Sequence, residues 1–407
     1  MKILVHDYAG HPCQIELSRE LARRGHRVIH AYFSGDPGPK GQLIRQSGDS
    51  PHLSFVGVGA RRPYDKTSLV RRRFDDVAYG QRAHRLIVTE KPDVVISGNT
   101  PTEAQGLIAK GCHAAKAAFV FWMQDVYSIA ASHILRSKFG PLGTAIGLYY
   151  RHLERRLLQH SHAIVTISED FAPLAAAWSG AAAKVFTIEN WGAAQTIRPG
   201  PKDNAWSRAH GLHDGFNFLY AGTLGLKHDP ELLIALARHT IGRARVVVVS
   251  AGSGVQSLLA ARDREKLDNL IVLPLQPFSC FGDVLASADV AVAMIEPAAG
   301  SFSVPSKVQS YFCAGRPILL SAPASNLAAR LVARENAGLV VSPTERDAFL
   351  AAAMRLANAR PFAASCADNS RAFAAGAFDI GAITDRFLDV IHHAVSASGR
   401  GASRVRS

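Results

Sequence analysis

The sequence has few cysteines, and their spacing argues against two kinds of site. Only five occur in 407 residues, and they form no C-x-x-C pair: Cys13, Cys112, Cys280, Cys313 and Cys366. A disulfide framework or a structural zinc site needs paired or closely spaced cysteines. We therefore expect a reducing compartment and a cytoplasmic location.

Long hydrophobic runs are also missing. No stretch approaches 18 uninterrupted apolar residues, so we expect no segment that spans a bilayer. The opening MKILVHDY reads as a short strand and lacks the basic region and cleavage site of a signal peptide. Neither an Asp-x-Asp pair nor a His-Glu-x-x-His pattern occurs, so we expect no metal site and no cofactor.

Charge is distributed unevenly along the chain. Residues 1–200 contain 25 Lys and Arg against 16 Asp and Glu, a net +9, and the rest contains 21 against 17, a net +4. Six basic residues fall within 13 positions: Arg61, Arg62, Lys66, Arg71, Arg72 and Arg73. This surplus suits an anionic membrane face, an anionic acceptor or a nucleic acid, and equally an ordinary solvated surface.

Short apolar runs rich in Val and Ile alternate with helical patterns in two successive series. The strands expected in the first series are Lys2–His6, Arg27–Phe33, Asp93–Ser97, Ala118–Met123, Ala163–Ile167 and Lys184–Ile188. Those expected in the second are Phe216–Tyr220, Arg245–Ser250, Leu270–Leu273, Val290–Ile295, Pro317–Leu320 and Leu339–Val341. Continuous apolar runs and strand–helix alternation are typical of buried parallel sheets covered by helices. We expect an α/β fold of two Rossmann-like, doubly wound domains that face each other across a cleft.

Helical periodicity and breaks in it suggest where the domains begin and end. Helices are expected at Gln14–Arg24, Gly147–Gln159 and Ile380–Val395. The first domain is placed at 1–195 and the second at 216–375, on either side of an aperiodic, Pro- and Gly-containing linker at 196–215. A C-terminal helix at 376–396 and a disordered basic tail at 397–407 complete the chain.

Ligands of open parallel sheets bind at the carboxyl ends of the strands, so the loops that follow the strands are candidate sites. In the second series, Gly222, Thr223 and Lys227 follow the first strand and precede a helix. A glycine-bearing loop of this kind presents backbone N–H groups to phosphate, although a tight turn with a solvated lysine would look the same. Gly252 and Gln276, in the next two loops, are weak indicators by themselves.

The fourth loop carries the run Val304-Pro305-Ser306-Lys307 after a strand that ends near Ile295. Proline is favoured in a first helical turn and serine is a good cap, so we expect a helix to begin at Pro305 or Ser306. Lys307 would then lie at the positive end of the helix dipole, where a lysine is unfavourable unless an anion binds there. A surface lysine at a helix start is the alternative.

The order of these motifs resembles one enzyme family. YAG with a following lysine, a valine strand with a glycine loop, LPLQP, VPSK…AGRPIL and AGLVV resemble the donor domain of family 4 retaining glycosyltransferases. The VPSK form is similar to bacterial colanic-acid, O-antigen and exopolysaccharide transferases. HDY, ELARRGHRV, WMQD, YYRHLERRLLQHSHAIVTIS and IENW in the first half agree, so the resemblance covers roughly residues 1–395.

This resemblance implies a GT-B fold, a UDP-sugar donor on the second domain and a saccharide or lipid-linked acceptor on the first. It implies that Lys227 and Lys307 act in catalysis at the diphosphate. The other residues that it implies around the donor are Gly10, Gly222, Thr223, Gly252, Gln276, Glu296, Val304, Pro305, Ser306 and Ser310. Retention of the anomeric configuration is implied by the resemblance alone.

The sequence departs from the usual family pattern in two places, which involve three residues. Thr223 stands where an arginine is common, and Phe302 and Ser310 stand where two glutamates are common. A carboxylate contact to the ribose is therefore lost at Ser310, which leaves Glu296 as the remaining candidate for it.

Preorganised donors at the leaving phosphate are expected to make the largest contribution to catalysis, and the missing Asp-x-Asp pair favours a metal-independent reaction. On the acceptor side, Asp125 ends the run FVFWMQD and is expected to point into the cleft. There it could take the proton of an acceptor hydroxyl or orient that hydroxyl. A helix cap before Val126 is the alternative, and Asp7 and His11 are weaker candidates of the same kind.

The stretch FGPLGTAIGLYYRHLERR joins apolar, aromatic and basic residues. It can lie at a membrane surface or form a core helix with a charged outer side. With the net +9 of the first half, it suits a lipid-diphosphate acceptor and a peripheral contact with the inner face of an anionic membrane.

Two other functions compete with the transferase. A nucleotide-sugar 2-epimerase would share the fold and the donor pocket. A nucleic-acid-binding protein should interleave basic residues with aromatics, but the cluster at 61–73 holds only Tyr64 among its basic residues, so we expect no nucleic-acid partner.

Overall fold

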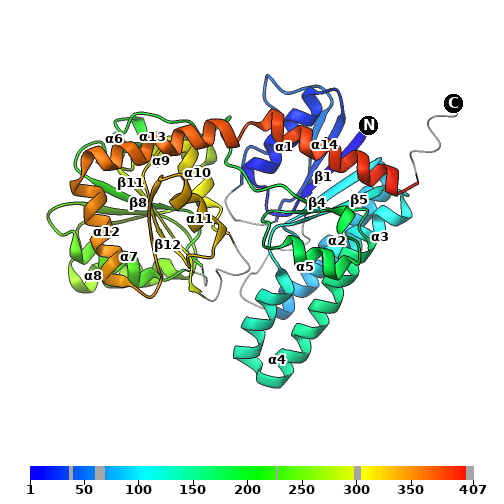
Figure 1. Ribbon diagram of the computed structural model, residues 1–407, viewed down its shortest axis with the longest axis horizontal. Helices are drawn as coiled ribbons and strands as arrows, with labels where there is room; N and C mark the ends of the chain where they lie inside the picture. The colour runs from blue at the N-terminus through cyan, green and yellow to red at the C-terminus, as the bar shows by residue number, and fades with distance from the viewer. Residues whose placement is uncertain (36–39, 60–68, 226–227, 298–303, 400–407) are drawn as a thin grey trace. The chain divides into compact units, whose positions relative to one another are not determined.

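The chain folds into two compact units, and the first is discontinuous in sequence. The computed structural model describes residues 1–35, 40–59, 69–225, 228–297 and 304–399. Met1–Asn190 and the segment from Ile380 form the first unit, whereas Trp191–Asp379 form the second. Each is a parallel sheet flanked by helices (Figure 1).

The first unit is built on a seven-stranded sheet in the order β3-β2-β1-β4-β5-β6-β7, with every neighbouring pair parallel. Its strands are β1 (Lys2–Asp7), β2 (Arg27–Phe33), β3 (Leu53–Val58), β4 (Val94–Gly98), β5 (Ala118–Met123), β6 (Ala163–Thr166) and β7 (Val185–Thr187). Its helices are α1 (Pro12–Arg23), α2 (Leu69–Glu90), α3 (Thr102–Ala114), α4 (Tyr127–His160), α5 (Ala172–Ser179), the 3-10 turn η1 (Ala182–Lys184) and α14 (Ile380–Ala397). The strand order reverses between β1 and β4, which is where doubly wound sheets bind ligands.

The second unit repeats this plan with a six-stranded parallel sheet in the order β10-β9-β8-β11-β12-β13. Its strands are β8 (Asn217–Ala221), β9 (Arg245–Val249), β10 (Leu270–Leu273), β11 (Val290–Met294), β12 (Ile318–Ser321) and β13 (Gly338–Val341). Its helices are α6 (Ala205–Ala209), α7 (Pro230–His239), α8 (Gly254–Glu265), the 3-10 turn η2 (Phe278–Cys280), α9 (Phe281–Ala286), α10 (Lys307–Ala314), α11 (Leu327–Arg334), α12 (Arg346–Asn358) and α13 (Arg360–Ala377). The order reverses between β8 and β11.

Helix α4 is a hairpin of two helical arms. The backbone of Gly140 has φ 54° and ψ −127°, and Pro141 follows it, so the helix breaks and turns back at this point. The arms are close because Gly143 and Gly147 face the other arm, where a Cβ would overlap the carbonyl of Leu135 and the side chain of Ser132. In Figure 1 the hairpin projects from the sheet of its unit.

Helix α14 closes the core of the first unit although it lies almost 200 residues beyond Asn190 in sequence. Its Phe387 is fully buried and packs on Trp122 of β5, with ring centroids 4.7 Å apart. Arg24 forms an ion pair with Asp385 and donates to the carbonyl of Gly381 at 2.8 Å.

Every strand predicted from the sequence corresponds to a strand of the structure, as does the α/β class. Strand β3 was not predicted. Residues 196–215, expected as the linker, contain α6 and belong to the second unit. The predicted helix at 147–159 is the second arm of α4. Arg61, Arg62, Lys66 and residues 400–407 of the predicted tail lie outside the described residues.

Candidate functional site

In the second unit, the loops after β8 and β11 meet where the strand order reverses. Helix α10 begins at Lys307, one or two residues later than expected. Ser306 precedes it, exposed, as the N-cap residue, but its side chain makes no capping hydrogen bond. The lysine therefore lies in the first turn, at the positive end of the helix dipole.

The side chain of Lys307 runs back over the first loop of the sheet. Its Nζ lies 3.5 Å from the carbonyl oxygen of Thr223, 3.4 Å from Nε2 of His228, and 4.9 Å from the ring centre of Tyr220. Burial lowers the pKa of Lys307 from 10.5 to about 8. Within the described part of the chain, no carboxylate forms an ion pair with it.

Gly222 makes room for this lysine. Its φ is +126°, which residues with a side chain rarely adopt, and a Cβ there would lie 3.1 Å from Cε of Lys307. The predicted glycine of the first loop is thus required both by its own backbone and by its neighbour.

Gly252 joins the first loop to the second. Its φ is +122°, and a Cβ would come within 2.5 Å of the carbonyl oxygen of Leu224. That carbonyl accepts from the N–H of Gly254 at 3.1 Å, and the N–H of Leu224 donates to Ala251 at 2.9 Å. The two loops therefore hold each other in place beside α8.

The remaining residues predicted around the donor have different positions. Gln276 accepts from Nε1 of Trp206 at 3.1 Å, so α6 holds its side chain. Glu296 is half-buried two residues beyond β11, and Ser310 is half-buried in α10. Val304 and Pro305 precede the helix, whereas Lys227 and Phe302 lie outside the described residues.

In the first unit, the loop after β1 is organised by a buried carboxylate. Asp7 is fully buried and accepts from the N–H groups of Ala9, at 3.2 Å, and His11. Its Oδ1 also lies 3.2 Å from Nδ1 of His11 and 3.4 Å from the amide of Asn99. Burial alone would raise the pKa of Asp7, but the His11 ring and its hydrogen bonds outweigh it and lower that pKa. Gly10, with φ +74°, completes this turn.

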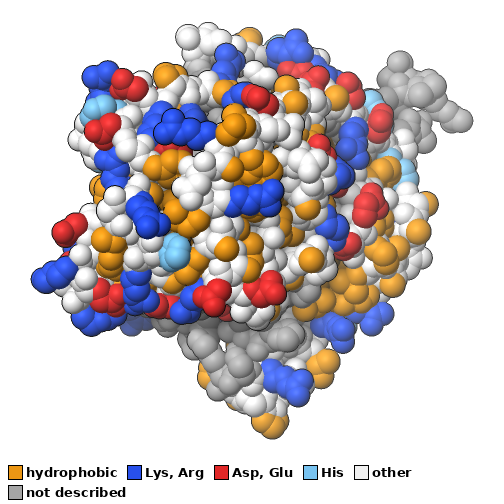
Figure 2. All heavy atoms as spheres, turned by 60° about the vertical axis from the view of Figure 1, so that its left-hand side comes forward, with side chains coloured by type: hydrophobic (Ala, Val, Ile, Leu, Met, Phe, Trp, Pro, Cys, Tyr) orange, Lys and Arg blue, Asp and Glu red, His pale blue; other side chains and the backbone are white. Residues whose placement is uncertain are grey.

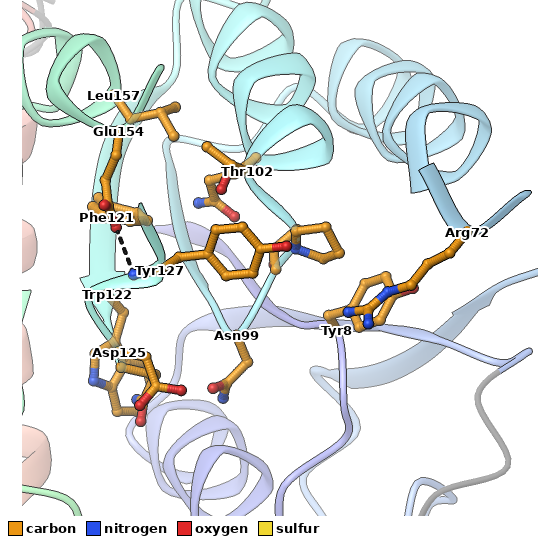
Figure 3. Close-up of a pocket in the computed structure, with 14 residues that line it drawn as sticks. Tyr8, Arg72, Asn99, Thr102, Phe121, Trp122, Asp125, Tyr127, Glu154 and Leu157 are labelled. Carbon is orange, nitrogen blue, oxygen red and sulfur yellow. Dashed lines mark hydrogen bonds between the residues drawn. The ribbon is translucent and has the colours of Figure 1, made fainter. Parts of the chain in front are cut away.

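A pocket of about 400 Å³ opens beside this loop, at the carboxyl ends of β1, β4 and β5 (Figure 3). It is lined by Tyr8, Arg72, Asn99, Thr100, Pro101, Thr102, Gln105, Phe121, Trp122, Gln124, Asp125, Tyr127, Glu154 and Leu157. The lining thus combines aromatic rings with amide groups, a guanidinium and carboxylates. Such a mixed lining suits a ligand with hydroxyl groups on a partly apolar frame.

Asp125 reaches this pocket from the end of β5, and Figure 3 shows its carboxylate on the same side as the amide of Asn99. The start of α4 is capped by another residue, because Glu154 accepts from the N–H groups of Tyr127 at 3.1 Å and Ser128 at 3.0 Å. Burial raises the pKa of Glu154, and the nearby charge of Asp125 acts in the same direction.

Several lining residues were not predicted as site residues. Tyr8 donates to Asp76 at 2.8 Å, and the same carboxyl lies 3.7 Å from Arg72. Asp76 of α2 thus contacts two of the residues that line the pocket. Asn99 and Tyr127 lie in segments with no motif. The sequence does place Glu154 on the same helical face as Leu157, and a carboxylate on an apolar helical face indicates a buried or functional position.

Among the described residues, no group of three or more His, Cys, Asp or Glu could hold a metal ion. No helix in that part of the chain is both long enough and apolar enough to cross a bilayer.

Comparison with known proteins agrees with this architecture. Residues 12–191 match the family model described as the glycosyl transferase 4-like domain. No curated protein sequence matches the chain.

Solved structures resemble both units together. HepE from Anabaena, in complex with UDP-glucose, matches with a TM-score of 0.70 at 16% identity over 96% of this chain and 99% of that chain. Sucrose-phosphate synthase from Thermosynechococcus elongatus matches with 0.73 at 15% over 98% and 100%. WaaG, a glycosyltransferase involved in lipopolysaccharide biosynthesis, matches with 0.63 at 14% over 96% and 99%. The chain has the GT-B fold of these solved structures, and its residues 12–191 match the model of the glycosyl transferase 4-like domain.

Proposed function

We propose that this chain is a glycosyltransferase that moves a sugar, with retention of configuration, from a UDP-sugar to a saccharide or lipid-linked acceptor. The observation that carries the donor half is Lys307, a partly buried cation at a helix start. A buried cation is costly unless an anion compensates it, and the diphosphate of the donor would do so. HepE, which has the same fold, has been solved with UDP-glucose and with UDP.

At the donor site, negative charge develops on the leaving diphosphate as its bond to the sugar breaks. The Lys307 ammonium and the start of α10 are the preorganised groups that would stabilise this charge. Lys227, from the same loop as Gly222, is proposed as a second cation at the diphosphate. Ser306, exposed and not engaged in capping, is available as a hydroxyl donor beside them.

At the acceptor site, we assign the acceptor sugar to the pocket around Asp125. Carboxylate and amide groups accept and donate the hydrogen bonds that sugar hydroxyls offer, and Tyr8, Trp122 and Tyr127 supply apolar surface. In the reaction the acceptor oxygen bonds to the anomeric carbon, the bond from that carbon to the diphosphate breaks, and UDP leaves with the bonding electrons. Asp125 orients the reacting hydroxyl or takes its proton.

The proposed donor site is tested by measuring how much UDP and GDP raise the melting temperature of the protein. UDP should stabilise the wild-type protein, and Lys307→Ala and Lys227→Ala should reduce this stabilisation. Lys110→Ala, at an exposed position of α3, is the matched control and should respond like the wild type. If neither nucleotide stabilises the wild type, the proposed donor site is wrong.

The type of reaction is tested by analysing the products. Incubation with a UDP-sugar and acceptor should release UDP and yield a glycoside whose anomeric proton, seen by NMR, has the donor's configuration. A 2-epimerase would instead release a free epimer without any acceptor. That alternative is not favoured, because residues 12–191 match a transferase domain.

A further inference from the structure

The hairpin α4 is a narrow, closely packed projection. Its arms run from Tyr127 to Phe139 and from Pro141 to His160, and they pack at Gly143 and Gly147, where there is no room for a Cβ. The arms therefore hold each other along the half nearer the turn. Whatever the turn contacts will be fixed relative to the body of the unit.

The turn end of this hairpin is apolar and uncovered. From Phe139 to Tyr150 the sequence contains no charged residue. Phe139, Leu142, Leu148 and Tyr149 are 47%, 64%, 59% and 41% exposed. In the rest of the described chain, the large hydrophobic side chains of comparable exposure are Ile44, Phe74 and Ile241. Clustered exposure of this kind marks an interaction surface.

Basic side chains lie on both arms behind this apolar end. Arg136 lies four residues before Gly140, whereas Arg151, Arg155 and Arg156 lie farther along the second arm, toward its base, and all four are exposed. The single carboxylate of α4, Glu154, is buried and occupied as the helix cap. Figure 2 shows hydrophobic and basic side chains at the lowest part of the molecule, which is the end of α4 in Figure 1.

Helix α2 adds to the same surface. Arg73 lies over the ring of Tyr149, 5.6 Å from its centre, and pairs with Glu103 at 3.2 Å. The neighbouring Phe74 is 72% exposed. The apolar and basic character thus extends from the hairpin onto the body of the unit.

We propose that the end of α4 inserts into the surface of an anionic phospholipid bilayer. Its apolar turn would enter the boundary between headgroups and acyl chains, and Arg136, close to the turn, would meet the lipid phosphates. A second copy of this chain fits the surface less well, because pairing two such hairpins would bring arginines against arginines. This inference rests on the proposed function, since a lipid-linked acceptor gives the enzyme a reason to bind a membrane.

The hairpin also connects this surface with the acceptor pocket. Tyr127, Glu154 and Leu157, at the base of its arms, line that pocket. At a rise of 1.5 Å per residue, the 12 steps from Tyr127 to Phe139 place the pocket about 18 Å along the arm from the turn. Insertion would therefore hold the pocket no more than about 20 Å from the bilayer, where the saccharide of a lipid-linked acceptor stands.

The test is flotation of the full-length protein with vesicles of phosphatidylcholine alone or with added phosphatidylglycerol. We expect binding to the anionic vesicles that weakens with salt. Leu142→Glu and Leu148→Glu should each weaken it about tenfold or more, since each replaces a leucine that insertion would bury in the bilayer by a charged side chain. Arg136→Glu, close to the turn, should weaken it by at least about fivefold. Ile241→Glu, at an equally exposed position of the second unit, should change nothing.

UDP-induced thermal shift of the same variants separates this proposal from the proposed function. The hairpin variants should retain the wild-type response to UDP. If the wild type responds to UDP but ignores both vesicles, or if Ile241→Glu weakens binding as much as Leu142→Glu does, membrane insertion by α4 is refuted and the donor site stands. If sedimentation shows a dimer that the leucine variants dissociate, and vesicles are not bound, the surface is a contact between copies instead.

Discussion

At the scale of single residues, the charged side chain of Lys307 favours binding of an anionic ligand but lowers the stability of the ligand-free protein. Burial lowers its pKa from 10.5 to about 8, so between these two values the unfolded chain binds more protons than the folded one. The charged ammonium therefore destabilises the free protein below about pH 8, and this cost disappears as the pH rises towards 10.5. A residue that destabilises the free protein in this way is expected where a ligand supplies the missing charge.

Replacing Lys307 by methionine should thus stabilise the protein while harming its function. We expect Lys307→Met to raise the melting temperature at pH 7 by roughly 2 to 4 °C and to abolish the shift caused by UDP. Differential scanning fluorimetry at pH 7 and pH 10 would measure both, and the difference from wild type should shrink at pH 10. Lys110→Met is the control. A lower melting temperature at pH 7 for Lys307→Met would contradict the charge argument.

Asp125 should affect turnover and not donor binding. Because Asp125 lines the pocket proposed for the acceptor, Asp125→Asn should lower kcat by about a hundredfold to ten-thousandfold, with the UDP-induced thermal shift unchanged. UDP release from a UDP-sugar in the presence of acceptor measures the first quantity. Asp75→Asn, in helix α2 of the same unit, should retain full activity. If kcat is unchanged in Asp125→Asn, the carboxylate of Asp125 has no role in the reaction.

At the scale of elements, the glycines of α4 are predicted to determine the shape of the hairpin. Gly143→Ala would push a methyl group into the backbone of Leu135, so we expect a loss of about 1 to 3 kcal/mol in the free energy of unfolding and weaker vesicle binding. Gly106→Ala is the matched control, because that helical glycine of α3 faces open space. It should stabilise the protein by about 0.5 to 1 kcal/mol. Denaturant titration compares the two, and equal effects would show that the arms are not closely packed.

The elements also show how far the sequence predicts this structure. Strands buried on both faces are continuous apolar runs and were predicted within one residue at each end, and β5 was predicted to the residue. Strand β3 (Leu53–Val58) lies at the sheet edge with only its two end residues buried, so its sequence carries no such run. The first arm of α4 was missed because Gly140 and Pro141 indicate the end of a helix but not that another arm packs against it.

The site was predictable only where it depends on one segment. The start of α10 at Lys307 follows from local signals within a residue or two. Its contact with Gly222, 85 positions away, depends on β8 lying beside β11, which only the sheet order fixes. For the same reason the pocket around Asp125, which joins Arg72, Asn99 and Glu154 from separate elements, could not be assembled from spacing.

At the scale of the whole molecule, the two units should respond separately to core mutations. Phe387 is fully buried against Trp122 in the first unit, so Phe387→Ala should destabilise that unit by about 3 to 5 kcal/mol. Hydrogen exchange should then quicken in β5 and not in β8. Phe349→Ala, in the core of the second unit, should give the reverse pattern. Equal acceleration in both sheets would mean that the chain unfolds as one cooperative unit.

Because α14 belongs to the first unit, that unit cannot complete its core until the second unit has been synthesised. A ribosome makes all 189 residues of Trp191–Asp379 after Asn190 and before the helix that closes the core around Trp122. At about 5 to 20 residues per second, the nascent first unit waits roughly 10 to 40 seconds with that core open. The second unit, continuous in sequence, can complete its fold earlier. Chains that stall or lose their last thirty or so residues would thus keep a finished second unit and an incomplete first unit that chaperones and proteases can recognise.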